Sequence, residues 1–335
     1  MGKNRKIKAG HIILLVVLIL GSCFILIRKN HLHYYENSGK VFGTEYHIKY
    51  ESYHDLHDSI IAVLGQVDNS LSVFNDGSII SKINRNEPVV PDKMFRDVFS
   101  QAQQVSQQTD GAFDITVAPL VNLWGFGFKK SASVSKTLID SVMNIVGFQK
   151  VSMKDGRIEK QNPNVMLDCS AIAKGYGVDM VARLLDRSGV NNYMVEIGGE
   201  IVVKGYNDVN KIWKIGIEKP VDDKTGSGNL QVVLPITNCA LATSGNYRNF
   251  YFKDGKKYAH TIDPKTGYPV QHSLLSASVI APTCAEADAY ATAFMVMGMD
   301  KAKVLLKRQK HLKAYFIYSD ATGKYKVWTN IRDLK

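Results

Sequence analysis

Apolar residues recur along the first half of the chain at two spacings, one typical of strands and one typical of helices. Residues 41–50 predict a strand, and the next segment predicts an amphipathic helix with an apolar stripe at Leu56, Ile60, Val63, Leu64, Val67 and Leu71. Residues 94–108 predict a second helix. Between residues 151 and 160, two short extended runs flank Asp155-Gly156, a turn sequence that favours a hairpin.

The second half of the chain predicts more strands and further helices. A helical stripe runs from Ser170 to Ser188, with Ser170 placed to cap its start and Gly189 to end it. Residues 285–297 predict a helix, and another follows from Lys301. The predicted strands are residues 192–197, 212–217, 230–234 and 274–280, with two short ones around Phe316 and Val327. Because strands and helices mix without regular alternation, the predicted fold class is α+β.

The N-terminus predicts a membrane tether over residues 1–30. An uncharged, mostly aliphatic run at residues 12–27 lies between two groups of cationic residues, as in a signal sequence or a signal anchor. The positive-inside rule then places everything beyond Asn30 on the periplasmic side of a bacterial inner membrane. Because Leu20-Gly21-Ser22-Cys23 also resembles a lipobox, a lipid-anchored form and an uncleaved anchor both stay open.

The charge of the chain does not indicate a nucleic-acid partner. The formal net charge is +11 over 335 residues, and the six Lys and Arg of residues 1–30, which contain no acidic residue, supply +6 of it. The other basic residues are scattered among acidic ones, so we expect no nucleic-acid surface. The remaining length fits an ordinary globular protein of one large domain or two smaller ones, and we take residues 36–335 as one domain.

Common metal and nucleotide motifs are missing from the sequence. Cys169, Cys239 and Cys284 show no C-x-x-C spacing, so we expect small buried hydrophobic residues rather than a zinc site or a disulfide framework. The chain also contains no Walker A loop, no complete dinucleotide fingerprint and no H-E-x-x-H. Any nucleotide chemistry must use another arrangement.

Asp288 and Thr292 form a candidate metal site. They lie four residues apart in a predicted helix and share a face, and a carboxylate with a hydroxyl gives the hard oxygen ligands that Mg²⁺ prefers. The same spacing also fits a solvated Asp and a core Thr. The pair alone does not separate these interpretations.

Two other segments carry candidate chemistry. Asp168 ends an apolar stretch just before a predicted helix start, where free N–H groups attract phosphate, and Lys174 lies one turn further on. A capping Asp and a surface Lys explain the same pattern. His260 precedes the rigid turn sequence of residues 263–267, which makes it a candidate acid or base.

Several long motifs, in one order, resemble the ApbE family of FAD:protein FMN transferases from about Phe42 to near the C-terminus. These motifs are Phe42-Gly43-Thr44, residues 109–116, residues 119–127, Asp168 with residues 173–176, residues 197–200, residues 243–248, residues 260–269, and residues 286–288 with Thr292. The resemblance implies an α+β fold of the ApbE type. It also implies Mg²⁺-dependent transfer of FMN from FAD to a Thr or Ser hydroxyl of an acceptor protein, with release of AMP.

The resemblance also implies roles for single residues. It places the metal at Ala171, Asp288, Ala291 and Thr292, with Ala171 and Ala291 able to offer only a main-chain carbonyl. It places FAD at Phe42, Phe74, Ala112, Phe113, Asp114, Asp168, Lys174 and Ile262. It makes His260 the expected base. Phe42 occupies a position where the family usually has Met, and Ala291 occupies a position where some members have an aspartate that binds the metal.

The implied partners are flavinylated proteins. Candidates are subunits of sodium-pumping NADH:quinone reductases or related electron-transfer complexes, and FMN-binding domains. A hydrolase that splits FAD into FMN and AMP would need the same ligands, and a flavin-binding module without catalysis is the third alternative. Asp288, Thr292 and His260 argue against the third, because storage alone does not require them.

Overall fold

The structure is a computed structural model that describes residues 9–29, 31–127, 134–220, 230–246, 250–253 and 256–332. Its helices are α1 (Ala9–Lys29), α2 (His57–Leu71), α3 (Ile79–Asn84), α4 (Lys93–Gln108), α5 (Ala118–Leu123), α6 (Lys136–Met143), α7 (Ala173–Arg187) and α8 (Cys284–Arg308). Its strands are β1 (His33–Val41), β2 (Thr44–Ser52), β3 (Val151–Lys154), β4 (Arg157–Lys160), β5 (Tyr193–Ile197), β6 (Glu200–Lys204), β7 (Trp213–Glu218), β8 (Leu230–Ile236), β9 (Cys239–Gly245), β10 (Phe250–Lys253), β11 (Lys256–Ala259), β12 (Leu274–Ala281), β13 (Lys313–Ser319) and β14 (Tyr325–Thr329).

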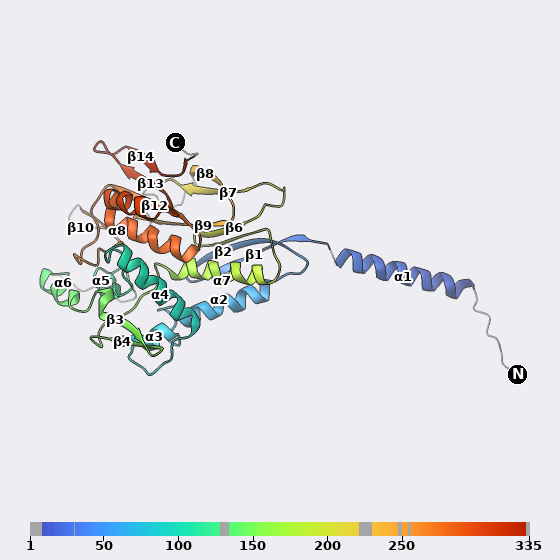
Figure 1. Cartoon of the computed structure of the whole chain (residues 1–335), viewed down its shortest axis with the longest axis horizontal. Coiled ribbons are helices and arrows are strands. Elements are labelled where there is room, and N and C mark those ends of the chain that lie inside the picture. The colour runs from blue at the N-terminus through green and yellow to red at the C-terminus, as the bar shows by residue number, and fades with distance from the viewer. Residues whose placement is uncertain are drawn as a thin grey trace.

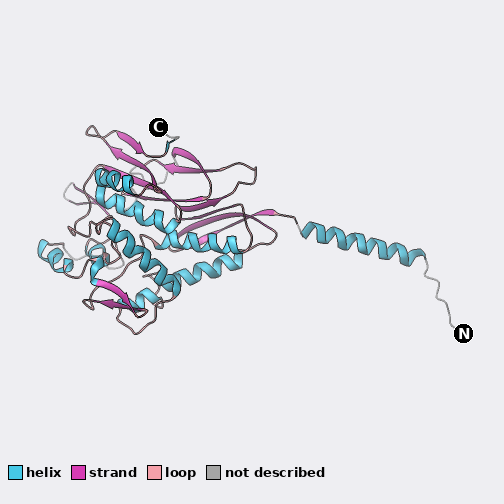
Figure 2. Cartoon of the chain, in the orientation of Figure 1, coloured by secondary structure: helices cyan, strands magenta, loops and turns pink. Residues whose placement is uncertain are grey.

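An eight-stranded antiparallel sheet organises the chain, in the order β1-β2-β5-β6-β9-β12-β13-β14. Helices α2, α7, α8 and α4 cover one face of it, and the β7-β8 ribbon lies over part of the other (Figures 1 and 2). Successive side chains of β13 alternate between these two faces: Phe316 packs under the helices, whereas Tyr315 and Ile317 pack under the ribbon. The predicted α+β class is confirmed.

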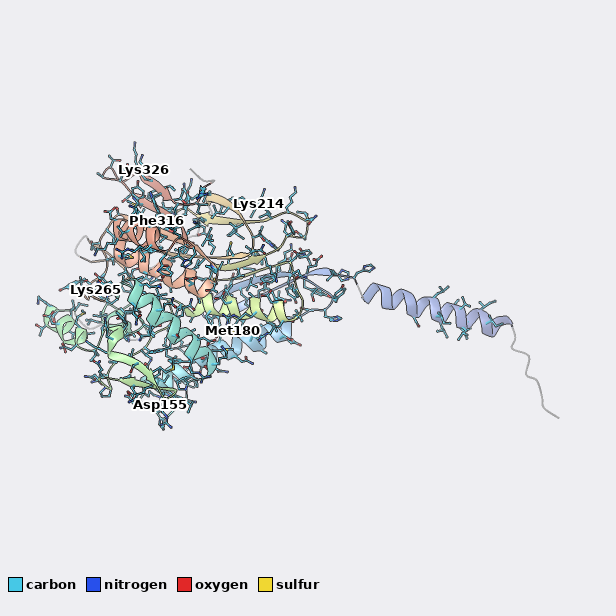
Figure 3. The ribbon with its side chains drawn as sticks, viewed as in Figure 1. Asp155, Met180, Lys214, Lys265, Phe316 and Lys326 are labelled. Atoms are coloured by element: carbon cyan, nitrogen blue, oxygen red, sulfur yellow. The ribbon has the colours of Figure 1, made fainter. Side chains whose placement is uncertain are left out.

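The predicted strand at residues 41–50 is wrong in its bounds, because the chain turns inside it. Phe42 and Gly43 both have positive φ, 52° and 75°, and they form a two-residue hairpin turn that pairs Val41 with Thr44. The hairpin at Asp155-Gly156 is confirmed, and its tip lies at the margin of the molecule opposite Lys326 (Figure 3). Strands β1, β6 and β9 and the short helices α3, α5 and α6 were not predicted.

Two helix predictions depend on single glycines. The predicted helices at residues 285–297 and from Lys301 are both present in α8, and Gly298 interrupts them with a φ of 75°. Gly189 follows α7 with a φ of 77°, as its predicted role at the helix end requires. The predicted cap at Ser170 is wrong: α7 begins at Ala173, and Ile172 stands at the N-cap without a side-chain hydrogen bond.

Helix α1 extends away from the rest of the described chain (Figure 1). Its apolar side chains from Ile12 to Leu20 are exposed. Within the part of the chain that the structure describes, no helix is both long and apolar enough to cross a membrane. The tether at residues 1–30 therefore stays a prediction.

Candidate active site

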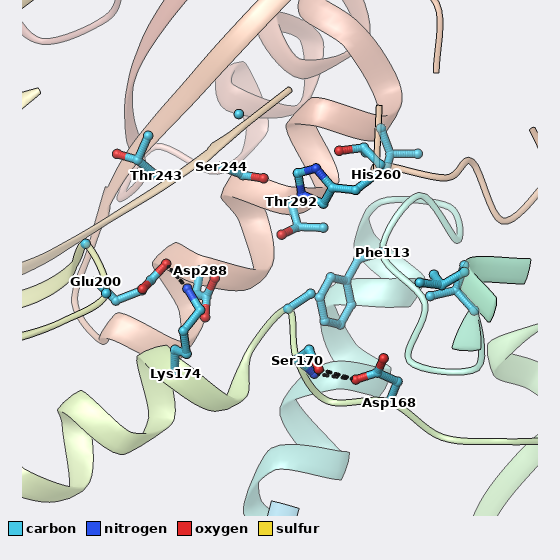
Figure 4. Close-up of a pocket in the computed structure, with 18 of the residues that line it drawn as sticks. Phe113, Asp168, Ser170, Lys174, Glu200, Thr243, Ser244, His260, Asp288 and Thr292 are labelled. Atoms are coloured by element: carbon cyan, nitrogen blue, oxygen red, sulfur yellow. Dashed lines mark hydrogen bonds and ion pairs between the residues drawn. The ribbon is translucent and has the colours of Figure 1, made fainter. Parts of the chain in front are cut away.

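A cavity of about 910 Å³ lies where α7 and α8 meet the loop of residues 112–117 and the end of β9. Of the predicted site residues, those that line it are Phe74, Ala112, Phe113, Asp114, Asp168, Ala171, Lys174, His260, Ile262, Asp288 and Thr292. Figure 4 shows several of these side chains converging from separate elements. Segments more than a hundred residues apart thus share one site.

Phe42 and Ala291 do not line this cavity. Phe42 lines a second pocket of about 390 Å³, which shares Phe74, Ser170 and Lys174 with the first. Phe74 stands between the two pockets with 75% of its surface exposed. Ala291, on the core-facing side of α8, is fully buried, so its role at a metal stays a prediction without structural support.

Three charged side chains meet at the centre of the cavity wall. Lys174 Nζ lies 2.6 Å from Oε1 of Glu200, the first residue of β6. Asp288, on α8, accepts a hydrogen bond of 3.1 Å at Oδ2 from the backbone N–H of Gly175. Glu200 and Asp288 are only 2% and 5% exposed. Two buried carboxylates therefore face one ammonium group.

The close approach of α7 and α8 creates this cluster. A Cβ on Gly175 would lie 2.4 Å from the backbone oxygen of Cys284, so only glycine allows the two helices to come this near. Asp179, one turn further along α7, accepts hydrogen bonds of 2.7 and 2.9 Å from the N–H groups of Cys284 and Ala285. This carboxylate caps the start of α8 from the neighbouring helix.

Burial dominates the electrostatics of the cluster. It raises the pKa of Glu200, and the nearby Asp288 raises it further while Lys174 lowers it. Burial also raises the pKa of Asp288. For Lys174, burial lowers the pKa, but the two carboxylates raise it more, so the ammonium form is favoured overall. The cluster holds one more acidic group than basic groups and favours a bound cation.

The oxygen atoms of this wall fit a divalent cation. In the described residues, no three His, Cys, Asp or Glu side chains are grouped to hold a metal. Asp288 and Thr292 nevertheless share one face of α8, and Glu200 Oε2 is buried without a hydrogen-bond partner in the described part of the chain. An unpaired buried carboxylate oxygen is costly unless a cation or a ligand satisfies it. Carboxylate and hydroxyl oxygens are the kind of ligand that Mg²⁺ prefers.

The neighbouring loops hold the rest of the cavity wall in place. Asp168 Oδ1 accepts hydrogen bonds of 2.8 Å from the N–H of Ser170 and 2.5 Å from its hydroxyl. Asp114 is engaged within its own loop, because its carboxylate accepts from Thr116 and from the N–H of Phe148. The carboxylate of Asp114 therefore shapes the loop.

His260 lies across the cavity from the charged cluster, near Thr292 (Figure 4). Its ring stands edge-on to Phe126, with the ring centroids 6.4 Å apart. The turn after it is fixed, because the indole of Trp124 donates a 2.8 Å hydrogen bond to the carbonyl of Gly267. The predicted turn thus anchors the segment that carries His260.

Glu200 and Ser244 are among the residues of this wall to which the sequence interpretation gave no role. Glu200 was part of a family motif but had no role assigned, although a lone acid opening the apolar run of residues 201–203 was a usable signal. Ser244 lines the cavity beside Thr292 and His260 (Figure 4). No local pattern singled it out. Tyr247 and Arg248, which completed one family motif, lie outside the described residues.

The fold and this site define a chain of the ApbE class. The family model described as "ApbE family" matches residues 42–316, so the chain belongs to the ApbE family. The resemblance stated from the sequence is therefore confirmed.

Relatives and solved structures agree with this membership. The chain is 37% identical over 336 residues to the FAD:protein FMN transferase of Haemophilus influenzae, covering 95% of each chain. It is 38% identical over 298 residues to that of Vibrio cholerae, covering 85% of this chain and 86% of the relative. The solved flavin transferase ApbE from Vibrio cholerae superposes with a TM-score of 0.81 at 34% identity, over 90% of this chain and 98% of the other. The apo flavinyl transferase ApbE of Pseudomonas stutzeri gives 0.80 at 32% identity, over 90% and 95%.

Proposed function

We propose that this chain transfers FMN from FAD to a Thr or Ser hydroxyl of an acceptor protein and releases AMP, with Mg²⁺ bound at Asp288 and Thr292. The observation that carries the proposal is the arrangement of one cavity, in which a buried acidic cluster faces a histidine. The names of the relatives supply the substrate and the acceptor class.

The residues of the cavity suit a single displacement at phosphorus. The acceptor oxygen forms a bond to the FMN phosphorus, the bond to the bridging oxygen breaks, and AMP leaves with that electron pair. His260 takes the proton of the attacking hydroxyl. Lys174 is held by Glu200 and places positive charge beside the pyrophosphate. A bound Mg²⁺ would neutralise charge on the pyrophosphate oxygens.

The two apolar rings near the cavity suit the flavin and the adenine. Phe74 projects between the two pockets with most of its surface exposed, and Phe42 lines the second pocket. Aromatic faces stack on planar ring systems with a gain of about 0.5–1.5 kcal/mol. We assign Phe42, Phe74, residues 112–114, Asp168, Lys174 and Ile262 to FAD on the family pattern.

The decisive experiment separates transfer from hydrolysis. The full chain in detergent is incubated with FAD, Mg²⁺ and the acceptor domain of a sodium-pumping NADH:quinone reductase subunit. We expect fluorescence of protein-bound flavin on a denaturing gel and one AMP for each flavin attached. Free FMN with an unlabelled acceptor would instead establish a pyrophosphatase, and retention of intact FAD would establish a binding module.

Two substitutions on one helix test the metal assignment. Asp288→Ala should abolish labelling at all Mg²⁺ concentrations, because it removes the only charged ligand that α8 offers to the cavity. Asp300→Ala lies on the exposed side of the same helix and serves as the matched control. Thermal melts of both variants check folding. Wild-type labelling by Asp288→Ala at low Mg²⁺ would refute the site.

Residues 1–30 bear on where the reaction occurs. We propose that they tether the chain to the inner membrane of a bacterium, with the catalytic part on the periplasmic side, where flavinylated electron-transfer subunits are the acceptors. The apolar run at residues 12–27 between cationic groups supports this. Incorporation of labelled palmitate that Cys23→Ser abolishes would establish the lipoprotein form, and its absence would establish an uncleaved anchor.

A further inference from the structure

Strand β9 has an open edge inside the cavity. On one side it pairs with β12 from Ala240 opposite Ala281 to Gly245 opposite Ser276. On the other side its pairing with β6 ends at Leu241, opposite Ile201. Beyond that point, no described strand pairs with residues 242–245 on this side. The β5-β6 hairpin turns away at Gly198-Gly199, and the cavity fills the space that it leaves.

The main chain of this edge directs hydrogen-bonding groups into the cavity. In an antiparallel ladder, successive residues of a strand direct their N–H and C=O groups alternately to its two neighbours. The N–H of Asn246 donates to the carbonyl of Leu275 next to β12, at 3.0 Å. By alternation Ser244 also faces β12, whereas Thr243 and Gly245 direct their N–H and C=O groups to the open side. Exposed strand edges of this kind recruit extended chains.

The side-chain directions along β9 determine which side chain of an added strand would point toward the proposed catalytic residues. Ala242 packs under α8, so Ser244, two residues on, points to the same face. Thr292, on α8, and His260 line the same cavity as Ser244 and are drawn close to it in Figure 4. Residues directly opposite each other on neighbouring strands share a face. The residue of an added strand opposite Ser244 would therefore project between the proposed metal ligands and the proposed base.

We propose that the edge of β9 at residues 243–245 binds the acceptor protein as an added extended strand, with its Thr or Ser opposite Ser244. This inference rests on the proposed transfer function. A Thr or Ser hydroxyl lies one bond beyond Cβ, so the acceptor main chain must itself enter the cavity to reach the phosphorus. The unpaired N–H and C=O groups of Thr243 and Gly245 then satisfy those of the incoming segment.

The residues that we assign to FAD do not include any residue of β9, so this edge is available to the acceptor. They lie on α7, on the loops at residues 112–114 and 168, and at Phe42, Phe74 and Ile262. One wall of the cavity thus carries charged and aromatic side chains, which suit FAD. Another wall carries the main-chain edge of β9, which suits an extended segment of the acceptor.

Two proline substitutions test the proposal. Gly245→Pro removes an edge N–H, while the bonds to β12 made by residues 244 and 246 remain. Val327→Pro is the matched control, because by the same alternation its N–H faces outward on β14, the last strand of the sheet. Its neighbour Lys326 lies at the outer margin of the molecule (Figure 3). Both variants are assayed as full chains with FAD, Mg²⁺ and the acceptor domain used above.

We expect Gly245→Pro to raise the KM for the acceptor domain about tenfold or more and to leave the Kd for FAD within about twofold of wild type. Val327→Pro should leave both constants unchanged. An unchanged acceptor KM in Gly245→Pro would overturn the docking site, and loss of FAD affinity alone would assign the edge to FAD instead. If the wild-type chain labels no acceptor at all, the transfer function fails and the docking site fails with it.

Hydrogen exchange on the wild-type chain covers the case in which Gly245→Pro does not fold. The acceptor domain is used with its flavinylated Thr replaced by Val, so that the complex cannot react. We expect the amides of Thr243 and Gly245 to exchange at least tenfold more slowly with this domain present, and to be unaffected by FAD alone. Unchanged exchange with the domain would overturn the proposal. Slowing that follows the concentration of the chain without any acceptor would also overturn it, in favour of pairing between two copies.

Discussion

Gly175→Ala tests the contact between helices on which the proposed site depends. The added Cβ would lie 2.4 Å from the oxygen and 2.6 Å from the carbon of the Cys284 carbonyl group. Both are backbone atoms, so no side chain can rotate to make room. To restore ordinary contact, α7 and α8 must separate by about 1 Å.

The size of the effect follows from two opposing contributions. Alanine raises helix propensity by about 1 kcal/mol relative to glycine. Overpacking in a rigid core costs about 1–3 kcal/mol, and the separation also weakens the 3.1 Å hydrogen bond from Gly175 to Asp288, at about 1 kcal/mol. We expect a net loss of about 1–3 kcal/mol in the free energy of unfolding, or about 1.5–5 °C in Tm for a chain of this size.

Gly65→Ala provides the control for the propensity contribution. Gly65 lies within α2, and a Cβ there would meet nothing within 4 Å. This variant should gain up to about 1 kcal/mol. Urea and thermal unfolding followed by circular dichroism measure both variants, and FAD titration shows whether the site opens with the helices. A Tm for Gly175→Ala equal to or above that of wild type would refute the reasoning.

Three further predictions address the cavity wall and its supports. Trp124→Phe removes the buried indole donor to Gly267, so it should cost about 1–2 kcal/mol in unfolding free energy, and a Tm within 1 °C of wild type would contradict this. Glu200→Gln should raise the KM for FAD about tenfold, because Lys174 loses its 2.6 Å ion pair; an unchanged KM would show that Glu200 does not position Lys174. Burial raises the pKa of Asp179 from 3.8 to about 6, despite two backbone hydrogen bonds that lower it. Protonated Asp179 therefore adds its full contribution to the free energy of unfolding at pH values below the pKa that this group has in the unfolded chain. This contribution is lost as the pH rises through about 6, the pKa in the folded chain. Relative to Asp179→Asn, wild type should lose about 2–3 kcal/mol between pH 4 and pH 7 in chemical unfolding, whereas a constant difference would mean that the pKa is not raised.

The sequence predicts the elements whose periodicity and end signals agree. Helix α7 has an apolar stripe and a glycine beyond its end, and the β3-β4 hairpin has Asp155 and Gly156 at positive φ. Both were predicted close to their observed bounds. Strand β9 was missed because Cys-Ala-Leu-Ala-Thr-Ser-Gly has a single β-branched residue, Thr243, no aromatic residue and no regular alternation. Its small residues lie under α8 in the centre of the sheet, where tertiary packing decides the conformation.

Some residues of the candidate site have a local signal in the sequence, and others are brought together only by the fold. Local patterns made Asp288 with Thr292, and His260 before its turn, candidates only, because the spacing of the pair fits a solvated Asp and a core Thr as well; the family resemblance was needed to assign them to the site. The partner of Lys174 could not be predicted locally, since Glu200 reaches it only after β6 enters the sheet beside α7. Phe42 was expected at the same ligand as Phe74, and the structure places it in the adjoining pocket.

The physical origin of the site lies in a few small residues rather than in the charged ones. Gly175 lets α7 approach the start of α8, and this approach puts Asp288 within hydrogen-bonding distance of the first turn of α7. Lys174, on that same turn, is thereby placed between two buried carboxylates whose charges it partly offsets. Because Glu200 Oε2 has no hydrogen-bond partner among the described residues, a bound cation or ligand would stabilise the cluster further. Affinity for Mg²⁺ should therefore depend on helix packing as much as on the ligands, and Gly175→Ala should weaken Mg²⁺ binding although it changes no ligand.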